Sequence, residues 1–495
     1  MPEGGLNIRW PDPWLDQELR LHKYKIYAAR AFARVNKLDR TIIDGPKARL
    51  GIVTTGKSYL DVRQALDDLG LDEASAAEVG IRLYKVGMPW PLEPEGAHAF
   101  AEGLEEILVV EEKRALIENQ LKEQLYNNPA EDRPRVIGKF DEAGEWVLPS
   151  NGELTPGRIA RVIAARIARF HTSPAIEERL AFLEAKEKAL AKPKFDFART
   201  PYFCSGCPHN TSTRVPDGSR AAAGIGCHFM SVWMDRSTQT YTQMGGEGAN
   251  WIGQAPFTHT KHIFTNLGDG TYNHSGALAL RASVASGANI TYKILFNDAV
   301  AMTGGQPVDN HFTVPQIAAQ VWAEGITALR IVTDEPEKYA IGTKWPEAAT
   351  LHHRDELDEI QRELREVEGV TVIIYDQTCA TEKRRRRKRG QMYDPPKRIF
   401  INQLVCEGCG DCGVVSNCVS IVPVETEFGR KRAIDQSSCN KDFSCVKGFC
   451  PSFVNVIGGQ VRKNSAAGDV RPDLFPVLPD PVVPAIPTVS PGKIL

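Results

Sequence analysis

Apolar runs alternate with amphipathic segments along the first part of the chain. Residues 48–55 predict a buried strand, and the apolar spacing over residues 60–66 predicts an amphipathic helix directly after it. Residues 105–112 predict a second strand that leads into a charged helix, and helical sequence follows from about 156 to 191. Alternation of this kind is typical of an α/β domain with a parallel sheet.

The pattern changes again beyond this domain. Apolar runs at 290–296 and 370–375 predict strands of a second α/β domain, whereas cysteines mark the part after it and prolines mark the end. We therefore predict four segments: an α/β domain at 1–192 that ends in a short linker, a second α/β domain at 193–392, a cysteine-rich domain at 393–460, and an extended linker or tail at 461–495.

Composition narrows the class of protein. The chain has 495 residues, 42% of them hydrophobic, and no apolar run long enough to span a membrane, so we expect a soluble protein with several cores. A formal net charge of -2 gives no overall attraction to nucleic acid. The basic run at 383–389 is read as a solvated linker or surface strip, with docking of an acidic electron carrier or an ion pair with another domain as the alternatives.

The eleven cysteines fall into two groups with the spacing of metal–sulfur ligands. The first group joins Cys204 and Cys207 to Cys227. The second group consists of Cys406, Cys409, Cys412, Cys418, Cys439, Cys445 and Cys450. Thiolates at steps of three with a distant Cys-Pro are typical of bacterial ferredoxins, so we predict electron transfer through iron–sulfur clusters, with structural zinc as the alternative. Ligand spacing of this kind also favours a reducing cytoplasm over a disulfide framework.

A second candidate site lies at Gly268-Asp269-Gly270, ahead of the strand at 290–296 and Asn297. Carboxylate and amide oxygens are ligands that Mg²⁺ prefers, and polar groups at the carboxyl ends of neighbouring parallel strands meet at one edge of a sheet. A helix predicted to begin near Ser275 would point its amino end at bound phosphates. The pattern therefore indicates magnesium and thiamine diphosphate, although Gly-Asp-Gly is also an ordinary turn.

Several stretches together resemble a known family. The sequences at 204–209, 224–228, 244–251, 267–270 and 297–306 are similar to the thiamine-binding part of 2-oxoacid:ferredoxin oxidoreductases, and above all to the indolepyruvate ferredoxin oxidoreductases of the large fused bacterial kind. The resemblance implies an α/β fold: a transketolase-C-terminal-like domain and a thiamine diphosphate-binding domain, both with parallel sheets, and a small ferredoxin-like iron–sulfur domain.

The resemblance also implies roles for individual residues. The residues expected to bind the cofactor are Cys227, His228, Gly246, Glu247, Gly268, Asp269, Gly270, Asn297, Thr303 and Gln306. Asp269, Asn297 and the main chain of Ala299 match the Mg²⁺ ligands, while Cys204, Cys207, Cys227 and Cys379 match a proximal [4Fe-4S] cluster. Ferredoxin topology assigns Cys406, Cys409, Cys412 and Cys450 to a distal [4Fe-4S] cluster.

Three cysteines of the second group remain after that assignment: Cys418, Cys439 and Cys445. Asp442 or a ligand from elsewhere would complete a second distal four-iron cluster, or the site holds a three-iron cluster, or it holds none. A lone histidine such as His228 is more often a structural hydrogen-bond partner than a ligand contact.

The reaction implied by the resemblance is oxidative decarboxylation of an aromatic 2-oxo acid, of the indolepyruvate or phenylpyruvate type, to acyl-CoA and CO₂, with electrons passing to ferredoxin. The glutamate that activates thiamine diphosphate is expected on a pyrimidine-binding domain outside this chain, so we expect the chain to act within a larger assembly of paired halves that also includes gamma-type domains or subunits. The alternatives are a superfamily member for branched-chain or other 2-oxo acids, a non-catalytic electron-transfer subunit, a non-redox thiamine enzyme, and a zinc-stabilised interaction protein.

Overall fold

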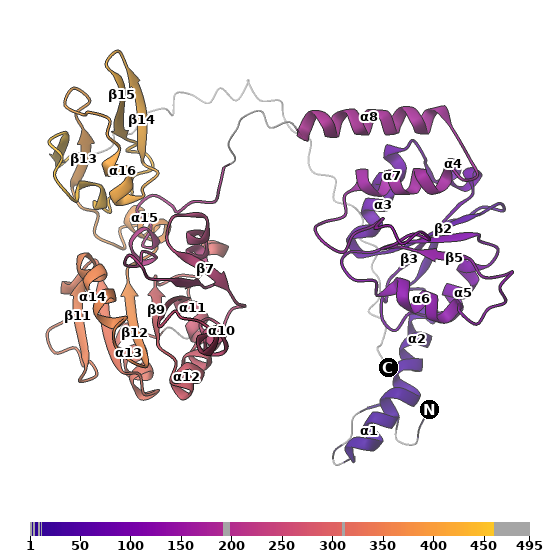
Figure 1. The fold of residues 1–495 in the computed structure, drawn as a ribbon, viewed down its shortest axis with the longest axis horizontal. Coiled ribbons are helices and arrows are strands. Elements are labelled where there is room, and N and C mark those ends of the chain that lie inside the picture. The colour runs from indigo at the N-terminus through magenta and orange to yellow at the C-terminus, as the bar shows by residue number, and fades with distance from the viewer. Residues whose placement is uncertain are drawn as a thin grey trace. The chain divides into compact units, whose positions relative to one another are not determined.

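The computed structural model describes residues 2, 5–7, 10, 12–191, 199–308 and 312–459, which form two compact units, Met1–Ala198 and Arg199–Leu495 (Figure 1). The predicted linker at 192–194 and the predicted tail at 461–495 lie outside the described residues. Within the described ranges, no helix has both the length and the apolar character needed to cross a membrane. The predicted division of the second unit near residue 392 stays a prediction.

The first unit is built on a five-stranded sheet with the order β1-β3-β2-β4-β5. Its strands are β1 (Arg40–Ile43), β2 (Leu50–Thr55), β3 (Ile81–Val86), β4 (Glu106–Val110) and β5 (Arg135–Ile137). All neighbouring pairs are parallel except β1 with β3 at one edge. The strands predicted at 48–55 and 105–112 are therefore confirmed as β2 and β4, and the parallel α/β fold with them.

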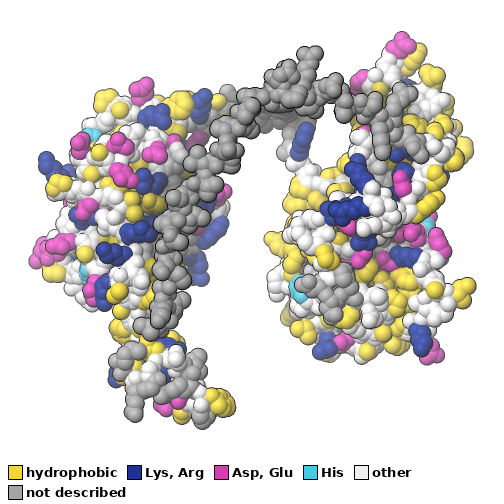
Figure 2. Space-filling model, turned by 180° about the vertical axis from the view of Figure 1, so that it is seen from behind, with side chains coloured by type: hydrophobic (Ala, Val, Ile, Leu, Met, Phe, Trp, Pro, Cys, Tyr) yellow, Lys and Arg dark blue, Asp and Glu magenta, His cyan; other side chains and the backbone are white. Residues whose placement is uncertain are grey.

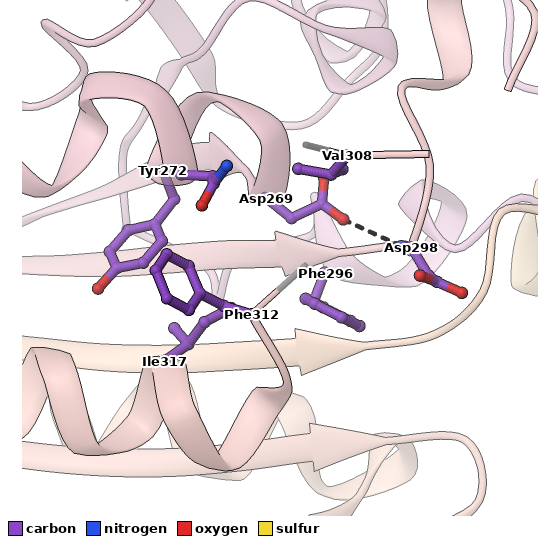
Figure 3. A pocket seen from close by; sticks show the side chains of 8 residues that line it. Asp269, Tyr272, Phe296, Asp298, Val308, Phe312 and Ile317 are labelled. Carbon is purple, nitrogen blue, oxygen red and sulfur yellow. Dashed lines mark hydrogen bonds between the residues drawn. The ribbon is translucent and has the colours of Figure 1, made fainter. Parts of the chain in front are cut away.

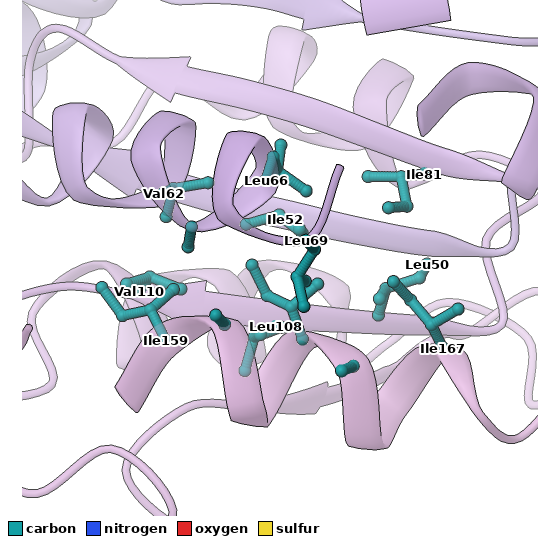
Figure 4. Close-up of a cluster of buried hydrophobic side chains, with 14 of the residues drawn as sticks. Leu50, Ile52, Val62, Leu66, Leu69, Ile81, Leu108, Val110, Ile159 and Ile167 are labelled. Atoms are coloured by element: carbon teal, nitrogen blue, oxygen red, sulfur yellow. The ribbon is translucent and has the colours of Figure 1, made fainter. Parts of the chain in front are cut away.

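Helices cover both faces of this sheet. The helices of this unit are α1 (Trp14–Arg20), α2 (Ile26–Val35), α3 (Gly56–Asp68), α4 (Glu73–Val79), α5 (Pro94–Ala101), α6 (Ile117–Leu125), α7 (Pro156–Ile167) and α8 (Pro174–Ala191), with a π-helical turn at Leu21–Lys25. Of these, α1 extends away from the sheet (Figure 1). Alternate residues of β4 point to opposite faces: Leu108 and Val110 pack with α3 and α7 (Figure 4), whereas Ile107 and Val109 pack with α5 and α6. Burial on both faces explains the continuous apolar run of β4.

The second unit contains a fully parallel seven-stranded sheet with the order β11-β10-β12-β9-β8-β6-β7. Its strands are β6 (Ala221–Ala223), β7 (Thr238–Tyr241), β8 (Ile263–Gly268), β9 (Ile290–Phe296), β10 (Ala328–Thr333), β11 (Ala349–His353) and β12 (Val370–Asp376). The strands predicted at 290–296 and 370–375 are confirmed. Strands β8, β9 and β12 lie next to one another, which matters for the site described below.

Helices again lie on both faces of the sheet. The α-helices are α9 (His209–Ser212), α10 (Ala249–Gln254), α11 (Asp269–Thr271), α12 (Ala277–Ser286), α13 (Val314–Ala323), α14 (Leu357–Leu364) and α15 (Ala380–Lys388), and shorter turns include η2 (Cys227–Trp233), η4 (Tyr272–Gly276) and η5 (Ala301–Thr303). Side chains of α13 pack on Leu329 and Ile331 of β10, whereas side chains of α14 pack on Ala328 and Val332. The second unit thus repeats the layered architecture of the first.

The cysteine-rich segment folds as two small antiparallel pairs. Strand β13 (Lys397–Ile401) pairs with β16 (Phe453–Ile457), and β14 (Ile421–Thr426) forms a hairpin with β15 (Gly429–Ile434). Helix α16 (Asp411–Ser416) and the turn η8 (Ser444–Val446) lie between them in the chain. The buried hydrophobic residues of this segment are Ile399 and Cys406, and its cysteines lie outside the strands. The ferredoxin-like nature of this segment stays a prediction.

Candidate active site

The candidate site lies where β8 and β9 end. These strands are parallel and in register up to the pair Gly268 and Leu295, so the residues that follow them emerge at the same edge of the sheet. Asp269 follows β8 directly, and Asn297 follows β9. The sequence placed both residues at strand ends, and the sheet order brings the two ends together.

Asp269 connects the two strand ends through its carboxylate. Its Oδ2 accepts hydrogen bonds from the main-chain nitrogens of Asn297 (3.0 Å) and Asp298 (2.9 Å), and its Oδ1 accepts one from Gly270 (2.8 Å). Figure 3 shows this carboxylate directed at the loop that carries Asp298, above the apolar side chains of Tyr272 and Phe312. Burial raises the pKa of Asp269 to about 6, against the opposing effect of the three N–H donors.

The helix after Asp269 begins earlier than the sequence predicted. Helical backbone runs from Asp269 through η4 into α12, so the predicted start near Ser275 was wrong. An aspartate is favoured in the first turn of a helix because its charge meets the free N–H groups there. The amino end of this helix therefore lies at the strand edge, where a phosphate would be bound most effectively.

The loop after β9 offers the other expected Mg²⁺ ligands. The Asn297 side chain is 8% exposed, and its Oδ1 has no hydrogen-bond partner among the described residues. Ala299 is 3% exposed and lines the same cavity. A buried amide oxygen without a partner is costly unless a ligand satisfies it, so Asn297 fits the role of a cation ligand.

A cavity of about 350 Å³ opens at this edge, within the size range of ligand pockets. Seven of the predicted residues line it: Cys227, His228, Gly268, Asp269, Gly270, Asn297 and Ala299. Its other lining residues include Met244 and Met302, which lie in the stretches at 244–251 and 297–306, and Thr271, Asn273 and Val308, which the sequence analysis had not singled out. The last three belong to no motif, and only the fold shows that they share a wall.

His228 is the lining residue with the most constrained surroundings. It is 3% exposed, and its Nε2 has no hydrogen-bond partner among the residues described. A Cβ on Gly224 would come within 2.7 Å of that nitrogen, so the backbone passes too close for any larger residue. Burial lowers the pKa of His228 to about 4, with the nearby charge of Lys293 as the second cause, and the ring is therefore neutral near pH 7.

The remaining predicted cofactor residues do not line the cavity. Gly246 lies in a turn in which its nitrogen bonds to the carbonyl of Gln243. Glu247 is 1% exposed, with Oε2 accepting a hydrogen bond from Gly245 and a pKa raised by burial. Thr303 and Gln306 bond to each other, with 2.6 Å between Thr303 Oγ1 and Gln306 Oε1. Their part in cofactor binding stays a prediction.

Four cysteines predicted for the proximal cluster lie near one another. Burial raises the pKa of the Cys207 thiol well above its usual value, and the charges of Cys204, Cys379 and Cys227 add to this effect. Burial likewise raises the pKa of Cys227 to about 11, with Cys379 and Cys204 as further causes. Cys227 also lines the cavity, and the nitrogen of Cys379 donates a 3.0 Å hydrogen bond to the carbonyl of Asn297. These four cysteines therefore lie beside the candidate cofactor site.

The thiols of the second cysteine group interact in two sets, and their assignment to two clusters stays a prediction. Besides burial, the thiols that raise the pKa of Cys412 are Cys409, Cys406 and Cys450. Besides burial, those that raise the pKa of Cys445 to about 12 are Cys439 and Cys418. Cys418, Cys439 and Cys445 also line one cavity together with Ser205, from the loop between Cys204 and Cys207.

Asp442 is not free to complete that trio. Its Oδ1 accepts hydrogen bonds from Arg354 Nη1 (2.6 Å) and Gln377 Nε2 (3.0 Å), and Ser444 donates to its Oδ2. Arg354 is 8% exposed, so the ion pair is shielded from water. The cavity is also lined by Asn440, Lys441 and several serines, with Ser205 Oγ 3.2 Å from Cys418 Sγ.

Across the described residues, no three His, Cys, Asp or Glu side chains are grouped in a way that could hold a single metal ion. Four thiolates around one zinc ion would be tightly clustered, because each Zn–S bond is only about 2.3 Å. Thiolates that surround a four-iron cube stand farther apart, because each one binds a different corner. The neighbouring but ungrouped thiols are compatible with the wider arrangement.

Comparison with known proteins finds a matching family for a segment of each α/β unit. Residues 39–193 match the family described as indolepyruvate ferredoxin oxidoreductase middle domain, and residues 224–375 match the C-terminal TPP binding domain of thiamine pyrophosphate enzymes. A 2-oxoglutarate:ferredoxin oxidoreductase structure from Magnetococcus marinus aligns with 38% of this chain and 67% of its own, at 18% identity and a TM-score of 0.28, which is too low to support an argument.

Curated relatives extend over most of the chain. The indolepyruvate oxidoreductase subunit IorA of Pyrococcus horikoshii is 27% identical over 442 residues, covering 85% of this chain and 62% of that protein. The same subunit of Thermococcus kodakarensis is 26% identical over 424 residues, covering 82% and 60%. The chain thus spans about three fifths of the length of these relatives. The predicted resemblance is confirmed by these matches, at 39–193 to the indolepyruvate ferredoxin oxidoreductase middle domain and at 224–375 to the thiamine pyrophosphate-binding domain.

Proposed function

We propose that this chain is the thiamine diphosphate-binding and electron-transferring part of a 2-oxoacid:ferredoxin oxidoreductase that forms acyl-CoA and CO₂. The observation that carries the proposal is the contact between the two sites: Cys227 lines the candidate cofactor cavity, and the nitrogen of Cys379 bonds to the carbonyl of Asn297. A non-redox thiamine enzyme has no use for four thiols at this position. An electron-transfer subunit alone has no use for Asp269 and Asn297.

The residues at the strand edge would hold the diphosphate through Mg²⁺. Asp269 would supply a carboxylate, Asn297 its partnerless amide oxygen, and Ala299 a main-chain carbonyl. When bound, thiamine diphosphate supplies the stabilisation of negative charge that loss of CO₂ requires. The chain contributes orientation, and a neutral His228 that adds no positive charge to the cavity wall.

Electrons would leave through the neighbouring thiols. Cys204, Cys207, Cys227 and Cys379 would hold the first [4Fe-4S] cluster at the cavity wall, and the group around Cys412 would hold a distal one. The trio Cys418, Cys439 and Cys445 borders Ser205 in the loop of the first group. With Asp442 held by Arg354, a three-iron cluster is the form that three thiolates suit best.

The relatives, whose name specifies indolepyruvate, support a choice of substrate class. We propose an aromatic 2-oxo acid of the indolepyruvate or phenylpyruvate type, with ferredoxin as acceptor and the pyrimidine-binding and gamma-type parts as partners in the cytoplasm. Comparing kcat/KM for indolepyruvate, phenylpyruvate and a branched-chain 2-oxo acid in the assembled enzyme would test this choice. Preference for the branched-chain acid would contradict it.

The decisive experiment is cofactor analysis after anaerobic purification with the partners that accompany the chain. We expect thiamine diphosphate and roughly eight to twelve irons per chain, with roughly eleven if the trio holds three. Cys379→Ser should remove roughly four irons, whereas Cys412→Ser should remove a different set and leave the proximal signal in the EPR spectrum. Zinc in place of iron, or wild-type protein without thiamine diphosphate, would overturn the proposal.

A further inference from the structure

The basic run at 383–389 forms most of helix α15, and its side chains are not simply solvated. The helix begins after Cys379, and Figure 1 shows it between the seven-stranded sheet and the cysteine-rich segment. Figure 2 shows several Lys and Arg side chains on the face of the second unit that is seen from behind. The reading of the run as a solvated linker or surface strip was therefore wrong for residues 383–387, whose ion pairs include those with Asp334, Asp298 and Asp394. Docking of an acidic electron carrier stays a prediction.

Arg386 reaches the loop that carries the expected Mg²⁺ ligands. Its Nη1 donates a 2.7 Å hydrogen bond to Asp298 Oδ2, and its Nη2 lies 3.5 Å from the Asp298 carbonyl oxygen. Asp298 has a φ of +57°, in the left-handed region that residues with a Cβ rarely adopt. Its nitrogen also donates to Asp269. Asp298 thus holds a strained conformation between two anchors, directly between Asn297 and Ala299.

Arg385, the preceding residue, holds the far end of the same loop. Its Nη2 donates a 3.0 Å hydrogen bond to the carbonyl of Gly304, and a Cβ on Gly305 would meet its Nη1 at 2.8 Å. Glu382 accepts from both arginines, at 2.5 Å from Arg385 and 3.1 Å from Arg386, and so orients the pair. Two consecutive residues of α15 therefore fix both ends of the loop.

The opposite side of the helix holds the cysteine-rich segment. Arg384 donates to the carbonyl of Ser437 (2.6 Å), and Arg387 donates to the carbonyl of Asn440 (2.8 Å). These two acceptors flank Cys439 in the chain. One short helix thus makes separate contacts with the candidate cofactor loop and with a cysteine loop.

We propose that α15 is a connector in which Arg386 is a positioning residue for the metal-ligand loop, while Arg387 positions the cysteine loop around Cys439. Without Arg386, Asp298 loses the contact that stabilises its left-handed conformation, and Asn297 and Ala299 lose their fixed directions. This inference rests on the proposed function, because it concerns the loop that would bind Mg²⁺ and thiamine diphosphate.

The test uses the assembled enzyme and measures the Kd for thiamine diphosphate at saturating Mg²⁺ together with iron per chain. Arg386→Ala should raise that Kd about 10–100-fold and leave iron unchanged, the range typical when a group that orients a metal ligand is lost. Arg386→Lys should recover part of the affinity, because it restores one donor. Arg387→Ala should lower iron and leave the Kd unchanged. Arg389→Ala is the matched control, since that exposed arginine closes the helix and has no side-chain hydrogen bond among the described residues.

Three other outcomes would overturn the connector proposal, and one of them would also overturn the proposed function. A wild-type Kd in Arg386→Ala would overturn the connector proposal while leaving the proposed function in place. Equal losses of thiamine diphosphate and iron in both variants would also overturn it, because they would indicate general destabilisation. Failure of the wild-type enzyme to bind thiamine diphosphate would overturn the proposed function, and this inference would fall with it.

Discussion

The two α/β units end their central strands in similar ways but satisfy the polar groups there differently. In the first unit, Glu111 follows β4 and its carboxylate accepts hydrogen bonds from the nitrogens of Ile117 and Glu118. In the second unit, Asp269 follows β8 and accepts from Asn297 and Asp298. Both carboxylates fix the backbone at the carboxyl edge of a parallel sheet, where ligand sites occur in this architecture.

The strands next to these, β2 in the first unit and β9 in the second, differ in the partners of the polar residues that follow them. After β2 of the first unit, Lys57 pairs with Asp61 (2.7 Å) and Glu153 (2.9 Å) from the same unit. After β9 of the second unit, Asn297 keeps a buried oxygen without a partner in the described part of the chain. The fold therefore provides the edge in both units, and in the second unit a buried amide oxygen without a partner among the described residues follows the strand next to the one that ends at Asp269. Side-chain chemistry, more than topology, distinguishes the candidate site.

Replacing Asp269 and Glu111, the carboxylates that follow β8 and β4, should have the most different effects on cofactor affinity and on stability. Asp269→Ala should weaken binding of thiamine diphosphate with Mg²⁺ by at least roughly 100-fold, because both a proposed metal ligand and the anchor of the Asn297 loop are lost. Glu111→Ala should leave that affinity unchanged and lower the free energy of unfolding, by about 1–3 kcal/mol for each buried N–H left without a partner. Isothermal titration and denaturant unfolding of both variants measure this. Equal loss of affinity in the two variants would contradict the comparison.

The strand ends could be predicted from sequence because buried strands are continuous apolar runs and polar residues follow them directly. Asp269 and Asn297 were recognised in this way, and the cysteine groups by their spacing. The walls formed by Asn273 and Val308, and the hydrogen bonds of Arg386, could not be predicted. They depend on segments distant in the chain meeting in space, and a run of arginines has the same local pattern whether it is solvated or paired.

Core substitutions should show whether the units unfold separately. Leu108 and Ile331 are both fully buried, one in each sheet. Replacing either with Ala should lower the free energy of unfolding of its own unit by about 2–5 kcal/mol, because a cavity is left in a packed core. Calorimetry should resolve a transition for each unit, with only one displaced in each variant. Displacement of both transitions by Leu108→Ala would show that the units unfold together.

The stability of the second unit should depend on pH through a histidine at the amino edge of its sheet. His262 lies just before β8, with its Nε2 2.7 Å from Thr291 Oγ1, and burial lowers its pKa to about 4. Between about pH 6.5 and 4 the unfolded chain binds a proton that the folded chain does not, so stability falls as the pH falls through this window, by up to about 3 kcal/mol. His262→Gln should flatten this dependence in urea titrations, whereas substitution of the exposed His259 should not.

The smallest change in stability is expected when the partnerless oxygen of Asn297 is removed. Because Asn297 Oδ1 bonds to no described residue, Asn297→Ala should hardly alter stability, yet it should weaken Mg²⁺-dependent binding of thiamine diphosphate by on the order of 10–100-fold. Lys57→Ala, at the matching strand end, should do the reverse: it removes solvent-screened ion pairs, so stability should fall slightly, and it should leave cofactor binding intact. If Asn297→Ala lowers stability and leaves the cofactor affinity unchanged, its oxygen has a structural partner in solution. The carboxyl edges of the two sheets would then be equally closed, and the cofactor would have to bind elsewhere.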